Sequence, residues 1–595
     1  MSTRVVFTVI ASFCFGAIFS SCTTGPITSV PPRPPPDWNV SLLDDTVGAI
    51  SDLEGLLPIP VRGYGLVIGL AGTGSRECPA QILKIIRDGF SGRTKSDGSV
   101  LYDNVDTRVL INELTTAVVV VDGRIPPAAA AGDRIDLYIS ALPNTQTTSL
   151  AGGELLVCEL SVQRVSASGT PIRRDPMAVA ADPEPAPVFV NPFTSADSAK
   201  RPISLRSARI IGGGRVLRTR PLSLVLRAQG GSYPLVTQIA RRLNFRFPSS
   251  PGEPPTAQAQ NVNIVKLMIP REYRNRKWHF LMLVLQTYLS ADPAYIATRS
   301  RQLISELSNP RSQADRIAAA LESIGNSTLP DLRRAYESSD PRVIFHAART
   351  AAMLDDIYAL PLLGRIAADD SSPYQLLAAS ALADLPHPYR ANQLLRTLLD
   401  SRNALVRIRA YKGLAGKADP SVRQVRFDRP AEFALDLALS KGRPLIYVQT
   451  AKEPRIAIIG QPTRCRVPVF YLSDDRLLTI SSTRPPTQNS TADAKPTEQL
   501  SLLRRTPTGD IGGILQSPPD LVSLIKALGS DVEPDYGGVR HGLGMDYSQV
   551  VAALYGLWRN KDIPAGFVLQ QSPAARALVE RPMAAAAQRP ETARP

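Results

Sequence analysis

A glycine-rich run at positions 62–75, which reads RGYGLVIGLAGTGS, has the outline of a phosphate-binding loop. Closely spaced glycines can present backbone amides to a phosphate group. This run lacks the lysine with which a P-loop reaches the outer phosphates, and its first glycines precede the apolar stretch 66–68 instead of joining a strand to a helix. We therefore predict a buried strand with glycines at its ends, where the backbone turns or approaches another segment closely.

The other polar clusters form no catalytic arrangement. Acidic pairs at 44–45, 369–370 and 474–475 fall at the edges of expected elements, where solvated caps and turns use carboxylates. The sequence has no Gly-x-Ser-x-Gly elbow in a strand-to-helix context and no His-Glu-x-x-His motif. None of the four histidines lies at zinc-ligand spacing from a cysteine, and His346 stands among alanines as a core residue would. We predict no enzymatic activity, no cofactor and no metal site.

The composition indicates a large, mostly folded and basic protein. The chain has 595 residues, of which 44% are hydrophobic, so we expect roughly three to four domains. The net charge of +15 comes largely from arginines scattered through all regions. Because no basic stripe with interleaved aromatic residues is found, we do not expect nucleic acid as a partner. Anionic polymers of the cell envelope or acidic neighbours are the more natural partners of this charge.

The N-terminus predicts export. Residues 1–22 combine a short basic start, an apolar core from Val5 to Ile18 that is too short to span a membrane, and small residues before Cys22. This arrangement is typical of a lipoprotein signal with a lipobox, in which the chain is cleaved before Cys22 and Cys22 is lipidated. An ordinary export signal remains the alternative, because Phe19 stands where leucine is usual.

A proline-rich linker is expected over residues 23–45. Its run Pro31-Pro32-Arg33-Pro34-Pro35-Pro36 favours polyproline II, which would hold a folded domain roughly 40–50 Å from an anchored lipid. After processing, three further cysteines remain, and an odd set so far apart in sequence is no disulfide framework. One bridge stays open, with no pairing assigned among Cys78, Cys158 and Cys465.

Residues 46–300 predict a strand-rich region with a few helices. Period-two or continuous apolar patterns indicate strands, and a period near 3.6 indicates helices. The expected strands are 116–121, 133–140, 152–157, 222–227 and 262–269, and the expected helices are 233–244 and 278–289. We expect a turn at 122–127 and a long loop between 165 and 201.

Residues 301–425 predict an all-α domain of stacked helical repeats. Three units begin near Asp340, Ser372 and Asn403, and each enters an alanine- and leucine-rich helix after a polar residue. A spacing of this kind resembles HEAT-type repeats, whose units cannot bury their apolar faces alone and therefore stack.

The C-terminal part predicts a return to mixed structure. We expect strands over 426–480, including 454–460 and 467–470, a flexible loop over 481–519, helices within 520–571 and a disordered tail over 572–595. The segment 531–542 looks inserted between the last two helices, which begin near 520 and 543.

The order of these patterns resembles the flagellar P-ring protein family. Members of this family show a G-Y-G-L-V-V-G-L-x-G-T-G segment, a valine-rich strand, a P-P turn, a G-x-x-I-D strand and a G-G-T-L-L segment in this order. The positions of this chain that match these motifs are Gly63, Tyr64, Gly65, Gly69, Gly72, Gly74, Pro126, Pro127, Asp136, Gly152 and Gly153. Strands and helices near 208–226, 239–244, 265–270, 454–470, 520–528 and 543–554 match later blocks of the family.

The resemblance implies an α+β protein in which strand-rich P-ring-like domains carry an inserted all-α, HEAT-like domain. It also implies a structural, non-enzymatic subunit that assembles with copies of itself in the periplasm, around the flagellar rod and beside the L-ring proteins, as a passive bushing. Peptidoglycan is a further candidate partner.

Two features depart from the family. P-ring subunits use an ordinary signal peptide, whereas Cys22 predicts a lipid anchor and attachment to the outer membrane. The helical repeats are also foreign to the family. The second hypothesis is therefore an envelope lipoprotein that uses a P-ring-like scaffold and its repeats to bind proteins.

Overall fold

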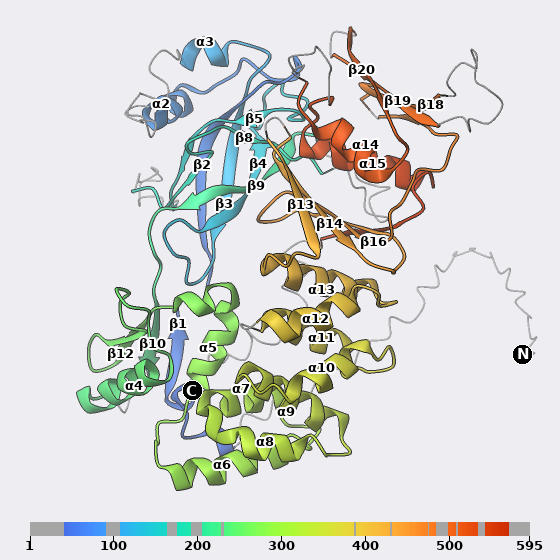
Figure 1. Ribbon diagram of the computed structural model, residues 1–595. Helices are drawn as coiled ribbons and strands as arrows, with labels where there is room; N and C mark the ends of the chain where they lie inside the picture. The colour runs from blue at the N-terminus through green and yellow to red at the C-terminus, as the bar shows by residue number, and fades with distance from the viewer. Residues whose placement is uncertain are drawn as a thin grey trace, which may run out of the picture.

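The computed structural model describes residues 41–90, 107–162, 175–191, 205–227, 231–385, 388–428, 431–473, 475–483, 498–506, 510–532 and 542–570. The predicted signal, Cys22, most of the proline-rich linker and the predicted tail lie outside these residues. The structure is a mixed α+β fold, so the expected class is confirmed. Four units follow one another around the molecule (Figure 1).

The first unit is an eight-stranded sheet that closes on itself. Its strand order is β6-β7-β9-β4-β3-β2-β5-β8. Backbone hydrogen bonds between Arg62 and Ser161, at 2.9 and 3.1 Å, join the β6 end of the sheet back to β2. The strands are β2 Ile59–Ile68, β3 Ala117–Ile125, β4 Arg134–Ala141, β5 Glu154–Leu155, β6 Cys158–Leu160, β7 Ala178–Ala180, β8 Ala186–Pro187 and β9 Ser207–Val216.

Alternation along these strands separates two cores, as a pleated sheet requires. Val119 and Val121 of β3 point into the closed interior, whereas Leu66 and Val118 pack outward against α2 Ala80–Phe90 and α3 Thr107–Ile111. The valine-rich run is therefore buried on both faces, which explains why it reads as a continuous apolar stretch.

The second unit is a four-stranded sheet with helices. The strand order is β1-β10-β12-β11, and the sheet shares a core with α4 and α5. Ser232 caps α4, and Val236, Ile239 and Leu243 form its buried face. The elements are α1 Val47–Ile50, β1 Ser51–Glu54, β10 Leu222–Leu226, α4 Tyr233–Arg246, β11 Ala257–Ala259, β12 Ile264–Leu267, η3 Arg271–Arg276 and α5 Lys277–Leu285.

The third unit is a stack of helices, as the repeat pattern predicted. Asp340 and Asn403 cap α9 and α13 through their side chains, whereas α11 begins three residues after Ser372 and has no side-chain cap. The helices are α6 Pro293–Glu306, α7 Ala314–Ile324, α8 Leu329–Ala335, α9 Pro341–Met353, α10 Ala359–Ala368, α11 Gln375–Asp384, α12 Pro388–Leu398 and α13 Ala404–Gly416, with the short η4 Asn326–Thr328 between α7 and α8.

Both ends of this stack are covered by other units. At one end α7 packs against α5, and at the other α13 packs against β13 and β16. There the Tyr411 hydroxyl donates to the fully buried Asp436 at 2.6 Å, and Arg455 pairs with the same carboxylate at 2.6 Å. Burial, with the Asp436 charge beside it, raises the pKa of Tyr411. The terminal repeats thus need no polar capping face of their own.

The fourth unit combines two sheets and two helices. A five-stranded sheet in the order β13-β14-β16-β15-β21 lies between the repeats and the helices α14 and α15, and a four-stranded sheet runs β17-β18-β19-β20. The elements are β13 Val422–Phe427, β14 Phe433–Leu439, β15 Leu445–Gln449, β16 Arg455–Gly460, β17 Phe470–Leu472, β18 Leu478–Thr483, β19 Gln499–Arg505, β20 Ile511–Ser517, α14 Leu521–Gly529, α15 Tyr547–Arg559 and β21 Gly566–Leu569.

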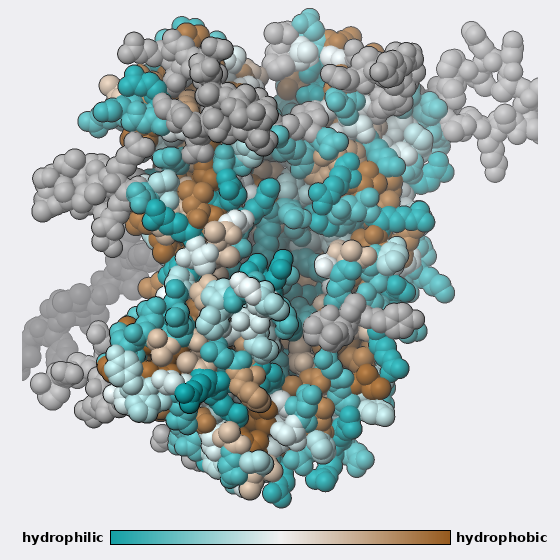
Figure 2. Space-filling view, turned by 60° about the vertical axis from the view of Figure 1, so that its left-hand side comes forward, coloured by the Kyte–Doolittle hydropathy of each residue, from teal (hydrophilic) through white to brown (hydrophobic). Residues whose placement is uncertain are grey.

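The units are arranged in a cycle, with the fourth unit beside both the repeats and the first sheet (Figure 1). The face in Figure 2 shows a hollow with mostly hydrophilic walls near its middle, and hydrophobic residues occur there in small separate groups.

Several expectations for local structure were wrong. The flexible loop predicted over 481–519 contains β19 and β20, whose residues Leu500 and Leu502 are fully buried; only 484–497 and 507–509 lie outside the described residues. The strand predicted at 454–460 corresponds to β16, whereas the one predicted at 467–470 begins only at Phe470, as β17, and belongs to a different sheet.

Two shorter expectations also need correction. The loop predicted between 165 and 201 holds the short strands β7 and β8, which pair with β9 and β5. The turn expected at 122–127 begins only at Pro126, because β3 continues to Ile125 and pairs with β2 along its whole length. Short strands flanked by proline lack the length at which alternation becomes a signal.

Candidate functional site: the glycine-rich strand and the junction between units

The glycine-rich run is a strand and its extension, and no phosphate loop forms there. Residues up to Ile68 belong to β2, and four of the next seven backbone amides donate to carbonyls within the protein. Leu70, Gly74 and Ser75 donate to the carbonyls of Thr115, Leu114 and Thr116 at 2.8–2.9 Å. The next helix, α2, begins only at Ala80. A phosphate would therefore find no helix N-terminus here, and most of the amides that follow the strand already donate within the protein.

Close packing explains the first glycines, which lie inside β2 and not at its ends as predicted. A Cβ atom at Gly63 would lie 2.2 Å from the carbonyl oxygen of Glu159 and 2.8 Å from the sulfur of Cys158. Those residues belong to β6, which meets β2 where the sheet closes. A side chain at this position would force β6 away, so the glycine permits closure of the sheet.

The other glycines of the motif meet at the far end of β2. Gly69 and Gly152 have left-handed φ angles of +76° and +74°, and the Gly153 amide donates to Leu150 as the chain turns into β5. Gly72 and Gly74 follow in the extension that packs on Thr116. Tyr64 is half-buried opposite Val120, and Pro126 and Pro127 start the connection to β4.

Asp136 lies apart from these glycines, at a junction between the first and fourth units. The ladder between β4 and β9 shifts register between Ile135 and Leu137, so Asp136 sits at a β-bulge. Its Oδ1 atom accepts hydrogen bonds from the backbone amides of Gly212 in β9 and Lys452 in the β15–β16 loop, at 2.8 and 2.9 Å. Arg209 lies 3.4 Å from Oδ2. One carboxylate therefore holds two segments together.

Gly212 allows this contact because nothing larger fits. Its φ is +62°, and a Cβ atom would lie 2.0 Å from the Lys452 carbonyl oxygen. The bulge therefore brings bare backbone of β9 against the tip of the β15–β16 hairpin.

The start of α15 forms the second part of the junction. Asp546 caps the helix in a capping box with Gln549, and burial raises the pKa of the Asp546 carboxyl to about 6. The next residue, Tyr547, lies with its ring centroid 5.6 Å from that of Phe189. Ser548 donates to the Val190 carbonyl at 2.7 Å. The segment after β8 thus contributes Phe189 to the core of the fourth unit.

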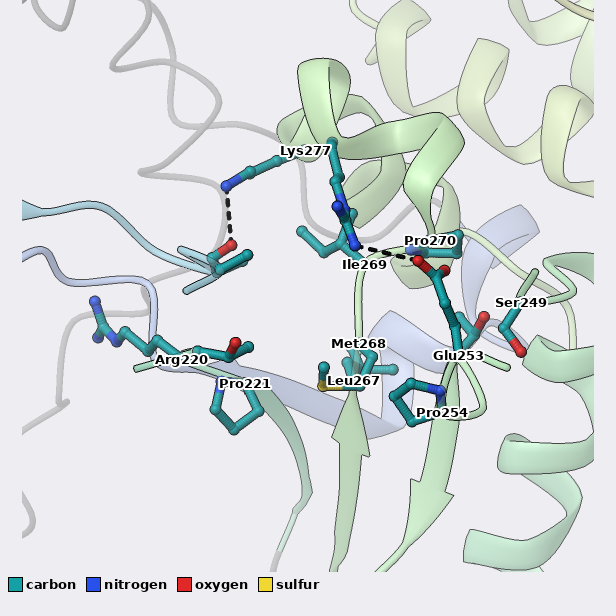
Figure 3. A pocket seen from close by; sticks show the side chains of 15 residues that line it. Arg220, Pro221, Ser249, Glu253, Pro254, Leu267, Met268, Ile269, Pro270 and Lys277 are labelled. Atoms are coloured by element: carbon teal, nitrogen blue, oxygen red, sulfur yellow. Dashed lines mark hydrogen bonds and ion pairs between the residues drawn. The ribbon is translucent and has the colours of Figure 1, made fainter. Parts of the chain in front are cut away.

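A third contact joins the first and second units. Lys277, the first residue of α5, donates to the Ala128 carbonyl at 2.9 Å and pairs with Asp133 at 2.8 Å. Beside it lies a cavity of about 310 Å³ (Figure 3). Arg274 at the same cavity pairs with Glu253 at 3.2 Å, so Arg274 and Lys277 are both engaged within the protein. Arg220 also lines the cavity, and its Nη1 atom is buried without a hydrogen-bond partner. We interpret this cavity as a gap left where the first and second units meet.

The remaining candidate groups are structural where the structure describes them. Burial lowers the pKa of His346 to about 4, and its ring stacks edge-on with Phe345. Cys78, Cys158 and Cys465 are free thiols, so the disulfide left open among them is not formed. Within the described ranges no group of acidic, histidine and cysteine side chains could hold a metal ion, and no helix has the length and apolarity needed to cross a membrane.

Family comparisons agree with this organisation. Residues 46–298 match the family model described as flagellar P-ring protein. Residues 300–383 match the model described as HEAT repeats, which covers α6 to α11 of the stack. The P-ring match includes the first two units, and with them the glycine-rich strand and Asp136.

Individual P-ring proteins are similar over the same region. A flagellar P-ring protein of Anaeromyxobacter dehalogenans (strain 2CP-C) is 28% identical over 267 residues, which are 44% of this chain and 63% of the relative. The Caulobacter vibrioides protein is 27% identical over 236 residues, 39% of this chain and 57% of the relative. The Rhodospirillum rubrum protein is 38% identical over 114 residues, 19% and 27%. The matches therefore span at most about two thirds of these relatives.

The junction residues outside Asp136 were missed at the sequence level. Gly212, Lys452, Phe189 and Ser548 come from four separate stretches, and nothing local marks them as neighbours. The triple glycine at 212–214 was the one available signal, because adjacent glycines in a strand indicate a bulge or a close approach.

Proposed function

We propose that this protein is a structural subunit of the flagellar basal-body P ring. Copies of the chain would associate head to tail in the periplasm, around the rod and beside the L-ring proteins, and would act as a passive bushing for the rotating rod. Such contacts form a ring when the rotation between neighbouring copies closes. Peptidoglycan is a further candidate partner, because its anionic groups suit the net charge of +15. The P-ring match over 46–298 carries this proposal.

We further propose that the repeats are an insertion in a P-ring fold and not an added domain. The fourth unit follows the repeats in sequence, yet it docks onto the matched first unit through Asp136, Gly212 and Lys452. Such a return is expected of a chain interrupted by an insertion, since closing a longer loop costs little extra free energy. The repeats would then decorate the ring.

The second candidate function is that of an envelope lipoprotein scaffold. The helical stack favours it, because HEAT-type repeats usually present an extended surface to protein partners. In this alternative the P-ring-like units only support the stack, and Cys22 anchors the protein to the outer membrane.

Deletion and complementation in a flagellated host separate the two. A ring subunit predicts loss of swimming on deletion, recovery with the wild-type gene and weaker recovery with Asp136→Ala. A strain that swims normally without the protein would reject the ring proposal. Lipidation is measured separately, as metabolic acyl labelling that is lost in Cys22→Ser.

A further inference from the structure

The most exposed large hydrophobic side chains on the helices that the structure describes lie on α4. Phe245 is 81% exposed and Tyr233 is 65% exposed, the highest fractions among large hydrophobic side chains on any helix. Arg241 lies between them in sequence and is also exposed. Pro234, Gln238, Arg241 and Phe245 recur at helical spacing, so they share one stripe opposite the buried face.

A shallow groove runs along this stripe. It has a volume of about 810 Å³ and lies between α4 and the segment Leu289–Ala291, which follows α5. Its lining holds Arg241 and Arg242 and no acidic side chain. Arg242 faces the protein, because it donates to the carbonyls of Tyr288 and Ser290 at 3.2 and 3.4 Å. The groove therefore has a positive charge that suits an anionic occupant.

The chain enters the described structure on the same segment. The Tyr288 hydroxyl donates to the Leu42 carbonyl at 2.6 Å, and the Leu289 amide donates to the Asp45 carbonyl at 3.1 Å. Cys22 precedes Leu42 by only twenty positions. Even a fully extended chain of that length spans no more than about 70 Å. A lipid on Cys22 would thus keep a bilayer within reach of α4, which lies at the lower left of the molecule in Figure 1.

We infer that the α4 face rests on a membrane surface that contains anionic phospholipid. Arg241 would meet lipid phosphates, and Phe245 and Tyr233 would lie at the level of the headgroups, where aromatic rings are favoured. The contact would add to the lipid anchor, as stable attachment often combines an acyl chain with basic residues. The inference rests on the proposed export and lipidation of Cys22, but the α4 contact can be measured without the anchor.

The test uses the full mature chain with Cys22→Ser, so that no acyl group contributes. Binding is measured by co-sedimentation with phosphatidylcholine vesicles that contain or lack phosphatidylglycerol. We expect binding to the anionic vesicles only, and weaker binding as salt is added. Arg241→Glu should lower the affinity about thirtyfold, since it removes one favourable charge and adds an unfavourable one. Phe245→Ser should lower it about fivefold or more.

Matched changes elsewhere provide the controls. Phe470→Ser on β17 removes an aromatic side chain that is 70% exposed, and Arg423→Glu reverses an exposed charge on β13. Neither should change binding, and circular dichroism should show all variants folded. Failure of the Cys22→Ser chain to bind anionic vesicles would overturn the inference. Equal binding by the α4 variants would also overturn it and would leave the groove to an acidic protein partner. Swimming assays test the ring proposal independently of either outcome.

Discussion

The carboxylate of Asp136 and the backbone amide of Lys452 lie 2.9 Å apart, although 316 positions separate these residues in the chain. The same oxygen accepts the Gly212 amide, so a strand bulge in the P-ring-matched region is bonded to a hairpin beyond the repeats. These hydrogen bonds close the four units into a cycle. They join segments that are far apart in the chain, and no local sequence pattern predicts them.

Replacing Asp136 should loosen this junction. Hydrogen bonds to a charged group contribute about 1.5–3 kcal/mol, so Asp136→Ala should lower the free energy of unfolding by about that amount. Asp136→Asn keeps one acceptor oxygen and should cost about 1 kcal/mol. Urea denaturation and limited proteolysis between units are the measurements. Asp122→Asn serves as the control, because it removes a surface pair with Arg62 and should change stability by less than about 0.5 kcal/mol. Equal effects at both sites would contradict the account.

A side chain at Gly212 should displace the β15–β16 hairpin. Gly212→Ala combines backbone strain at a φ of +62° with a Cβ placed 2.0 Å from the Lys452 carbonyl oxygen. Gly132→Ala has similar strain at a φ of +90° but open space around the new atom. We expect the Gly132 variant to lose about 1 kcal/mol of stability and the Gly212 variant at least about 2 kcal/mol more. Thermal unfolding followed by calorimetry compares them, and similar losses would show that the close approach is unimportant.

The role of the glycine-rich strand is tested at Gly63. Gly63→Ala should open the contact between β2 and β6 and lower stability by about 1–3 kcal/mol, because the new atom meets the Glu159 backbone. Gly416→Ala at the end of α13 enters open space and should be neutral or stabilising by up to about 1 kcal/mol. Chemical denaturation measures both variants. A phosphate-dependent shift in the stability of the wild type would instead revive the phosphate-loop interpretation.

The helical stack should become less stable in mild acid because of His346. Burial lowers its pKa from 6.5 to about 4, although Asp315 opposes this shift. Between those values the unfolded chain binds the proton and the folded chain does not, so stability present above pH 6.5 is lost as the pH falls towards 4. The loss attributable to this residue is at most about 3 kcal/mol. His346→Gln should flatten that part of the curve of melting temperature against pH. Parallel curves for the variant and the wild type would refute the assignment.

Local patterns were sufficient to predict much of this fold. The continuous valines predict the strand β3, and the amphipathic spacing predicts the helix α4. The polar residues Asp340 and Asn403 predict where α9 and α13 begin. The P-ring motifs led to the correct region, which the family match places at 46–298. The HEAT-like pattern was likewise matched over 300–383.

The failures share a physical cause. The polar, proline-bearing stretch before β19 and β20 dominates the local composition and predicts a flexible loop, whereas Leu500 and Leu502 become buried when β19 pairs with β18 and β20. The junction could not be predicted either, since a hydrogen bond between Asp136 and Lys452 depends on tertiary placement and leaves no periodic signal. Contacts between segments that are distant in the chain are therefore the part of a fold that is hardest to predict from a single sequence.

Electron cryotomography of basal bodies in cells with and without this protein distinguishes a ring subunit from an envelope scaffold. The ring account predicts density at the P-ring position in the wild type, its loss in the deletion strain and its return on complementation. It also predicts peripheral density that disappears when residues 310–416 are removed, provided that the shortened chain still assembles. An intact ring in cells that lack the protein would contradict the account and favour the envelope scaffold.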